Sequence, residues 1–200
     1  MVVLTSVMCT EMKMGLFHRM MAVHFNNRAE GSLTEVMQLL PLKEGAAVAD
    51  LGCGGGAFTL EFARRLGPAG EVYAVDVNAS HLAYVRDEAR KAELNNRIIL
   101  VLAEEDDSLL PENSIDLVFS RFSYHHIKEQ IKYFTHLKRA LKPTGSLVII
   151  DHDVSSRHMA KHGHAVSPEQ IRGDLRDAGF TCTKQYDHLP GQSFQMFTSN

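Results

Sequence analysis

The sequence predicts an α/β fold: a doubly wound, mostly parallel sheet with helices on both faces. From Ala46 onward, short apolar runs alternate with segments whose apolar residues recur every three or four positions. The first apolar run ends in a cluster of glycines, where a strand would give way to a helix. Repeated strand–helix units build parallel sheets that are covered by helices on both faces. These observations together set the expected fold class.

Five strands separated by helices are expected, followed by a weaker closing pair of strands. The continuous apolar run 98–102 is typical of a strand covered on both faces. The seven expected strands are 46–51, 71–77, 98–102, 115–119, 146–150, 181–186 and 193–198.

The intervening helices are expected from apolar residues on one face. The last helix has a clear start, with Ser167 as its cap and Pro168 in its first position, and a stop at Gly179. The expected buried faces are Phe58, Phe62 and Leu66; Leu82, Val85 and Ala89; Ile127, Ile131, Phe134 and Leu141; and Ile171, Leu175 and Ala178.

A glycine-rich loop with an acid before it follows the first strand. Four of the five residues from Gly52 to Gly56 are glycine, which lets a ligand approach the backbone closely. Gly52, Gly54 and Ala57 also satisfy a dinucleotide-binding pattern. Asp50 would repel a pyrophosphate but attract a cationic ligand, and it therefore argues against a nicotinamide cofactor.

Asp76 ends the second strand, twenty residues after the last glycine of the loop. A carboxylate there can accept hydrogen bonds from both ribose hydroxyls of a nucleoside ligand. The alternative is a helix cap, a role that Asn78 or Ser80 could fill equally well.

Four motifs in this order resemble those of class I S-adenosylmethionine-dependent methyltransferases. They are 48–56 (VADLGCGGG), 73–76 (YAVD), 115–118 (IDLV) and 141–145 (LKPTG). The resemblance covers about half of the chain. It implies a seven-stranded sheet whose last hairpin strand is antiparallel, and S-adenosylmethionine as the cofactor.

The resemblance also implies a role for each residue of the cofactor site. Asp50 and the glycine loop would hold the methionine end, Asp76 the ribose, and Val77 the adenine face. Glu104 would accept from the adenine amino group and Glu105 would donate its backbone N–H, although 104–107 could instead be a solvated acidic loop. The full set is Asp50, Gly52, Cys53, Gly54, Gly56, Asp76, Val77, Glu104, Glu105 and Ser120, the last expected near the transferring methyl group.

Histidines follow the fourth and fifth expected strands. His125 and His126 would face the cleft, and His125 is the preferred candidate for a general base, unless one of the pair caps or packs at a helix start. The segment 151–164 is also rich in histidine and aspartate, but its spacing matches no metal motif. We therefore expect no metal, and a polar loop on the substrate side.

Residues 1–45 are expected to form a helical extension to the cofactor-binding domain at 46–200. Apolar residues recur every four positions at Leu4, Met8, Met12, Leu16 and Met20, which suggests a lid over an apolar substrate or a dimer contact. The chain is thus expected to be a monomer or a homodimer.

Composition narrows the partners and the compartment. A net charge of -3 disfavours nucleic acid. The absence of a secretory leader pattern and of any stretch of about 18 apolar residues predicts no membrane association. Three widely spaced cysteines cannot form a disulfide framework, which favours a reducing, cytoplasmic location.

The expected function is methyl transfer from S-adenosylmethionine to a small-molecule acceptor that the sequence does not identify. The alternatives are a nonenzymatic protein that binds S-adenosylmethionine or S-adenosylhomocysteine and, less favoured because of Asp50, a nicotinamide-dependent dehydrogenase.

Overall fold

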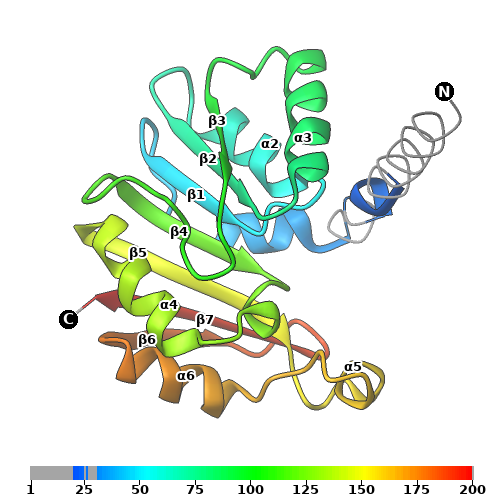
Figure 1. Ribbon diagram of the computed structural model, residues 1–200, viewed down its shortest axis with the longest axis vertical. Coiled ribbons are helices and arrows are strands. Elements are labelled where there is room, and N and C mark those ends of the chain that lie inside the picture. The colour runs from blue at the N-terminus through cyan, green and yellow to red at the C-terminus, as the bar shows by residue number, and fades with distance from the viewer. Residues whose placement is uncertain (1–19, 25, 27–30, 200) are drawn as a thin grey trace, which may run out of the picture.

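The computed structural model describes residues 20–24, 26 and 31–199. Their core is one seven-stranded sheet with the strand order β3-β2-β1-β4-β5-β7-β6 (Figure 1). This confirms the predicted α/β class. The strands are β1 (Ala47–Leu51), β2 (Glu71–Asp76), β3 (Ile98–Leu102), β4 (Ile115–Arg121), β5 (Leu141–His152), β6 (Phe180–Tyr186) and β7 (Gln192–Ser199).

Strand direction follows the expectation. β1 pairs in parallel with β2 and β4, and further parallel pairs join β2 to β3 and β4 to β5. β7 is antiparallel to both β5 and β6, so the closing hairpin completes the sheet at one edge. The chain winds outward from β1 in one direction and then returns to β4. This reversal makes the carboxyl ends of β1 and β4 the place where a ligand cleft is expected.

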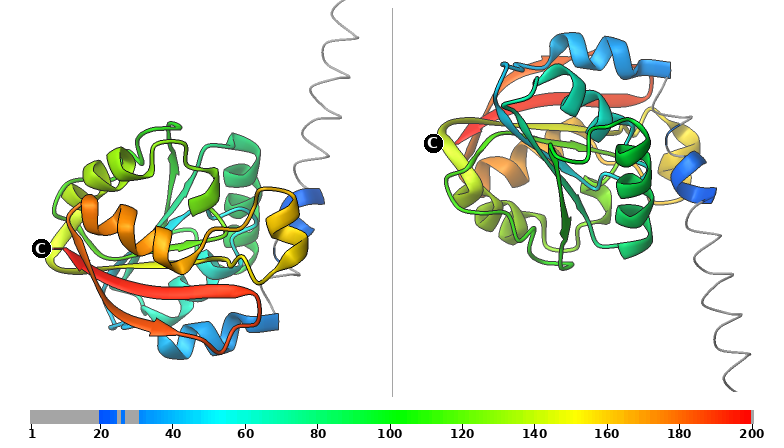
Figure 2. Two further views of the ribbon diagram at one scale, coloured as in Figure 1. Left: turned by 90° about the horizontal axis from the view of Figure 1, so that it is seen from below. Right: turned by 90° about the horizontal axis from the view of Figure 1, so that it is seen from above.

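Helices cover both faces of the sheet (Figure 2). One face carries the helix 31–39 with α2 and α3, and the other carries α4 and α6. The labelled helices are α2 (Ala57–Arg65), α3 (Ala79–Lys91), η1 (Tyr124–His126), α4 (Gln130–Leu137), η2 (Lys138–Ala140), α5 (Arg157–Lys161) and α6 (Pro168–Asp177).

Two apolar cores result from the alternation of side chains along the strands. Val48 and Phe119 point to the face of α2, where they pack with Phe58 and Phe62. Ala49, Leu51 and Val118 point to the opposite face, beneath α4 and α6. β1 and β4 are thus packed on both faces, and this packing positions the residues at their carboxyl ends.

The predicted start of α6 is confirmed. The Ser167 hydroxyl accepts a hydrogen bond from the Gln170 backbone N–H at 3.1 Å, and Pro168 takes the first helical position. Gly179 ends the helix with a φ of 87°, a backbone conformation that favours glycine.

Two packing predictions are wrong. β3 is an edge strand, not one covered on both faces, and Leu102 is 53% exposed. Ile131 is 43% exposed because α4 instead buries Tyr133, Phe134 and Leu137. Leu141, which was expected on this helix face, begins β5.

Of the expected N-terminal extension at 1–45, residues 20–24, 26 and 31–45 are described. Of the residues that define the predicted lid, Leu4, Met8, Met12 and Leu16 lie outside the described residues, whereas Met20 is described and exposed. Residues 20–24 are helical, and Ala22 is fully buried. Within the described part of the chain, no helix combines the length and the hydropathy that a membrane span requires.

Candidate active site

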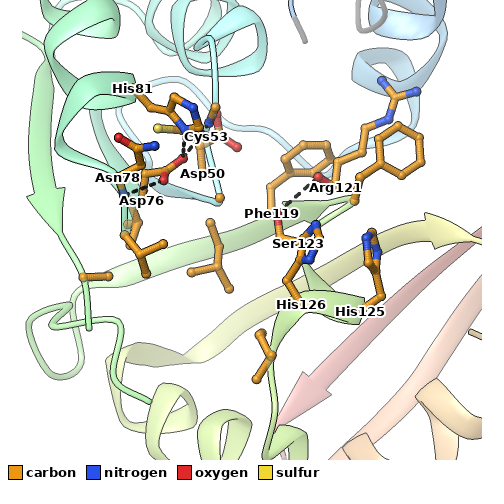
Figure 3. A pocket seen from close by; sticks show the side chains of 18 of the residues that line it. Asp50, Cys53, Asp76, Asn78, His81, Phe119, Arg121, Ser123, His125 and His126 are labelled. Carbon is orange, nitrogen blue, oxygen red and sulfur yellow. Dashed lines mark hydrogen bonds and ion pairs between the residues drawn. The ribbon is translucent and has the colours of Figure 1, made fainter. Parts of the chain in front are cut away.

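A cavity of about 690 Å³ opens at the carboxyl ends of the parallel strands (Figure 3). Its volume lies within the range of roughly 300–1,000 Å³ that is typical of small-molecule sites. The structure brings together most of the residues predicted from the sequence. Those that line the cavity are Asp50, Gly52, Cys53, Gly54, Asp76, Val77, Glu104, Glu105 and His125.

The Asp76 carboxylate organises the part of the cavity beside β2. It accepts a hydrogen bond from the Gly54 backbone N–H at 3.0 Å and another from the Asn78 N–H at 2.9 Å. His81 Nδ1 lies 3.2 Å from the same carboxylate. The cap of α3 is Asn78, whose side chain accepts from the Ser80 N–H. Asp76 is therefore not the helix cap, and its oxygens stay at the cavity wall.

Asp50 is a buried acid at the end of β1. Burial raises the pKa of its carboxyl to about 7, an effect that the nearby Asp76 reinforces and that a hydrogen bond from Thr59 Oγ1, 2.6 Å long, opposes. Burial likewise raises the pKa of the adjacent Cys53 thiol, which therefore stays protonated at neutral pH. A cation brought into the cavity would favour the ionised form of Asp50.

The glycines of the loop have two different roles. At Gly52, φ is 74°, and a Cβ atom there would overlap the Ser123 side chain. At Gly56, φ is 79° and a Cβ atom would meet Val85 of α3. Gly56 does not line the cavity. Its predicted contact with the cofactor is therefore corrected to a packing role between α2 and α3.

Ser120 is also corrected. Its side chain is fully buried, does not line the cavity, and its hydroxyl has no hydrogen-bond partner among the described residues. β4 continues to Arg121, two residues beyond the expected strand end. Ser120 thus lies within the sheet, and the residues past it, Phe122 and Ser123, reach the cavity instead.

The acidic loop after β3 borders the cavity and is held by backbone hydrogen bonds. The Ala103 N–H donates to the Asp76 carbonyl, and the Glu104 N–H donates to the Asp107 carbonyl at 2.9 Å. The Glu105 side chain points to solvent, where Lys128 lies 2.6 Å away and lowers the pKa of the carboxyl. The Glu104 side chain is also exposed and borders the cavity.

His125 is held by a fully buried carboxylate. Its Nδ1 lies 2.7 Å from Asp151 Oδ1, and its backbone N–H donates to Asp151 Oδ2 at 3.1 Å. When Asp151 is ionised it only accepts, so Nδ1 donates in this contact and Nε2 is the nitrogen left for another partner. Asp151 belongs to β5, so two neighbouring strands fix this imidazole.

Two more imidazoles lie beside His125 on the cavity wall. The ring centroids of His126 and His164 are 4.0 and 5.2 Å from that of His125. Partial burial and these two neighbours lower the pKa of His126 and so favour its neutral form. The sequence placed His164 only in a polar loop, and no local pattern connects it with η1.

An aromatic wall lies beside the imidazoles. Phe122 stacks on His152 with a centroid distance of 4.1 Å, and the Arg121 guanidinium lies 4.7 Å from the Phe122 ring. Phe122 has a φ of 57°, a strained conformation for a bulky residue. Such strain is concentrated at functional sites, and here it turns an aromatic ring into the cavity wall.

Sequence reasoning missed several other cavity residues. The Asn26 side chain accepts a hydrogen bond from the Ala57 backbone N–H at 3.0 Å, so the extension contacts the start of α2. Nothing in the sequence around Asn26 indicates this contact. His81 could have been found, because it lies one helical turn after the cap of α3 and follows Asp76 closely. The missed lining residues include Asn26, His81, Arg121, Phe122, Ser123, Tyr133 and Met159.

The fold and the site define the class. A parallel sheet with this strand order, an acid and a glycine loop after β1, and an acid after β2 are the features of class I S-adenosylmethionine-dependent methyltransferases. Residues 42–188 match the family described as methyltransferase domain, and the chain belongs to this family.

Named relatives agree with this class. The chain is 32% identical over 110 residues to the ubiquinone/menaquinone biosynthesis C-methyltransferase UbiE of Pasteurella multocida, a match that covers 55% of this chain and 41% of that protein. The chain thus spans less than half the length of that relative. The UbiE protein of Vibrio parahaemolyticus is 27% identical over 180 residues, with 74% and 70% covered.

A solved structure shows the same fold. The chain resembles a SAM-dependent methyltransferase from Aquifex aeolicus with a TM-score of 0.73 and 28% identity, covering 82% of this chain and 88% of that one. The predicted class, fold and cofactor type are thereby confirmed.

Proposed function

We propose that this protein transfers the methyl group of S-adenosylmethionine to a small, partly apolar acceptor that binds between Phe122 and the imidazoles. The observation that carries the proposal is that Asp50, Asp76 and His125 all line one cavity. Methyl transfer needs the acceptor in line with the bond between sulfur and the methyl group, and positioning supplies much of the acceleration.

The two ends of the cavity suit different ligands: one end suits the nucleoside of the cofactor, and the other suits the acceptor. Asp76 and Val77 line one part, where Asp76 can accept from ribose hydroxyls and exposed Val77 can contact adenine. Figure 3 shows Asp50 and Cys53 beside Asp76, with His125 and His126 farther along the cavity. This arrangement would direct the sulfonium and its methyl group toward His125.

The acceptor side combines apolar surface with a base. Phe119, Phe122, Ile127 and Met159 line it together with His125. When the nucleophile carries a proton, His125 Nε2 could remove it, and Asp151 would stabilise the resulting imidazolium. A nucleophile without a proton would need only positioning. Since the two UbiE relatives are named C-methyltransferases, carbon acceptors belong in any substrate panel.

We also propose that the N-terminal extension covers the cavity and that the protein works in the cytoplasm. Asn26 already borders the cavity, and this supports a covering role for the extension. Both described cysteines, Cys53 and Cys182, are free thiols, in keeping with a reducing, cytoplasmic setting.

Direct titration tests the choice of cofactor. We expect S-adenosylmethionine and S-adenosylhomocysteine to bind and to raise the melting temperature, because ligands that bind only the folded state stabilise it. NAD should do neither, since Asp50 would face its pyrophosphate. Calorimetry with all three compounds measures this. Binding of NAD alone would reverse the assignment, and turnover of labelled cofactor with an acceptor panel would separate an enzyme from a nonenzymatic binder.

Cofactor affinity should rise with pH. With a pKa of about 7, Asp50 is largely neutral at pH 6 in the free protein, and the cationic methionine end must displace its proton. We expect S-adenosylmethionine to bind roughly 8-fold more tightly at pH 7.5 than at pH 6. The affinity rises with pH because burial raises the pKa of the Asp50 carboxyl in the free protein and the bound cation lowers it again. Isothermal titration at both pH values measures the ratio.

The matched variant is Asp50→Asn, which keeps the shape and removes the titration. The variant should bind more weakly at pH 7.5 and lose most of the dependence on pH. The other groups around the carboxyl, Asp76, Cys53 and Thr59, are retained in it. An equally steep pH dependence in the variant would mean that another group titrates.

A further inference from the structure

Three imidazoles, from two separate parts of the chain, lie close together on the acceptor side of the cavity. His125 and His126 belong to η1, whereas His164 follows α5. One ring nitrogen of each lies within 4.8 Å of those of the other two. Nitrogen ligands around one zinc ion, at about 2.0–2.1 Å from the metal, are roughly 3.3 Å apart in a tetrahedral site. Rotation of the exposed His126 side chain and the partly exposed His164 side chain can bring the three ring nitrogens to this shorter separation.

The most buried of these rings, that of His125, has the support that metal ligands commonly have. Histidines that bind metals usually donate their second N–H to a carboxylate or a carbonyl, which fixes the tautomer and the ring orientation. The bond from His125 Nδ1 to Asp151 Oδ1 is of this kind. It leaves Nε2 as the ligand atom of a ring whose side chain is only 5% exposed.

We propose that His125, His126 and His164 form a site for one divalent transition-metal ion of the zinc class. Imidazole ligands suit zinc, cobalt, nickel and copper, whereas magnesium requires oxygen ligands. The set contains three histidines, the number of protein ligands found in catalytic zinc sites that keep one position open. Because all three rings line the cavity, the open position faces the acceptor space.

The metal site extends the chemistry of the acceptor side. An acceptor with a thiol, hydroxyl or carboxyl group could bind the metal at its open position, where coordination favours loss of the acceptor's proton. In the metal-bound protein His125 is a ligand, and in the metal-free protein its Nε2 remains a base. Metal binding itself does not depend on methyl transfer, and only this role for the acceptor rests on the proposed function.

The test uses the full chain without an affinity tag, stripped with a chelator that is then removed. We expect one Co²⁺ per chain to bind and to give the intense visible absorption of a four-coordinate ion, and Zn²⁺ to displace it. Mg²⁺ should not compete. His164→Ala should weaken Co²⁺ binding by at least about 100-fold, and Asp151→Asn by about 10- to 100-fold, the range typical of lost outer partners.

A neighbouring histidine pair provides the matched control. His158 and His162 have ring centroids 4.8 Å apart on α5 and its end, outside the three-histidine cluster. The double variant His158→Ala/His162→Ala should bind Co²⁺ as tightly as the unmodified chain. Binding lost in this variant but kept in His164→Ala would overturn the proposal, as would a chain that binds no Co²⁺ or Zn²⁺.

S-adenosylmethionine titration of every variant separates the two proposals. Retained cofactor binding in His164→Ala shows that the protein is folded, so that its loss of metal binding is specific. Metal binding without cofactor binding would refute the proposed function and leave the metal site standing. Cofactor binding without metal binding would do the reverse.

Discussion

Asp76→Ala is expected to weaken S-adenosylmethionine binding by roughly 10- to 150-fold, or about 1.5–3 kcal/mol. This is the cost of losing hydrogen bonds to a charged acceptor, here those from the two ribose hydroxyls. The same carboxylate accepts from the Gly54 and Asn78 backbone N–H groups, so the variant also loosens the glycine loop. Calorimetric titration measures the change in affinity.

A second aspartate separates the loss of a ligand contact from a loss of stability. Asp116 accepts a hydrogen bond from the Ala47 backbone N–H at 2.8 Å. It also forms an ion pair with Lys142 at 2.7 Å. It lies near the start of β4, at the amino ends of the parallel strands, whereas the cavity opens at their carboxyl ends. Asp116→Ala should lower the melting temperature while leaving cofactor affinity within about 2-fold. Equal losses of affinity in both folded variants would remove Asp76 from the cofactor site.

The fold could be predicted because its signals are local. The alternation of apolar runs with helical periodicity, and the cap at Ser167, depend on neighbouring residues, and the structure confirms both. Strand order is not local. The apolar run of β3 has the composition of a central strand, yet β3 lies at the edge, with Leu102 exposed. Only the path of the whole chain determines which strand ends the sheet.

The cofactor side of the site could be predicted for a similar reason. The glycine loop and Asp76 follow directly on strands that the sequence delimits well. The prediction for Ser120 was wrong because it depended on where β4 ends. The strand runs two residues further than its apolar residues indicate. A shift of two residues decides whether a side chain lies within a sheet or beyond it.

The acceptor side could be predicted only in part. His125 follows β4 closely and lies in the cavity as expected. Its partner Asp151 was noted in the sequence only as one of several acids and histidines after the fifth strand. His164 and Asn26 are far from His125 in the sequence and line the cavity only through tertiary packing, so their spacing gives no sign that they meet.

His125→Ala is expected to lower kcat by about 10²- to 10⁴-fold in chelator-treated enzyme with an acceptor that must lose a proton. This is the usual contribution of a positioned general base. The ring lies on the acceptor side, so the affinity for S-adenosylmethionine should stay within about 2-fold. Transfer of label from the cofactor, measured once the panel has yielded an acceptor, gives kcat, and titration gives the affinity.

The hydrogen bond between His125 and Asp151 allows a test of whether His125 acts by proton transfer. Asp151→Asn can no longer stabilise an imidazolium at His125 and can favour the wrong tautomer, so kcat should fall while the ring stays in place. Both variants should regain activity as the acceptor's own acidity increases, because a pre-ionised nucleophile needs no base. His158→Ala, on the exposed helix α5, serves as the control and should behave as the unmodified enzyme. A uniform loss of kcat across acceptors of all acidities would assign His125 to positioning the acceptor instead.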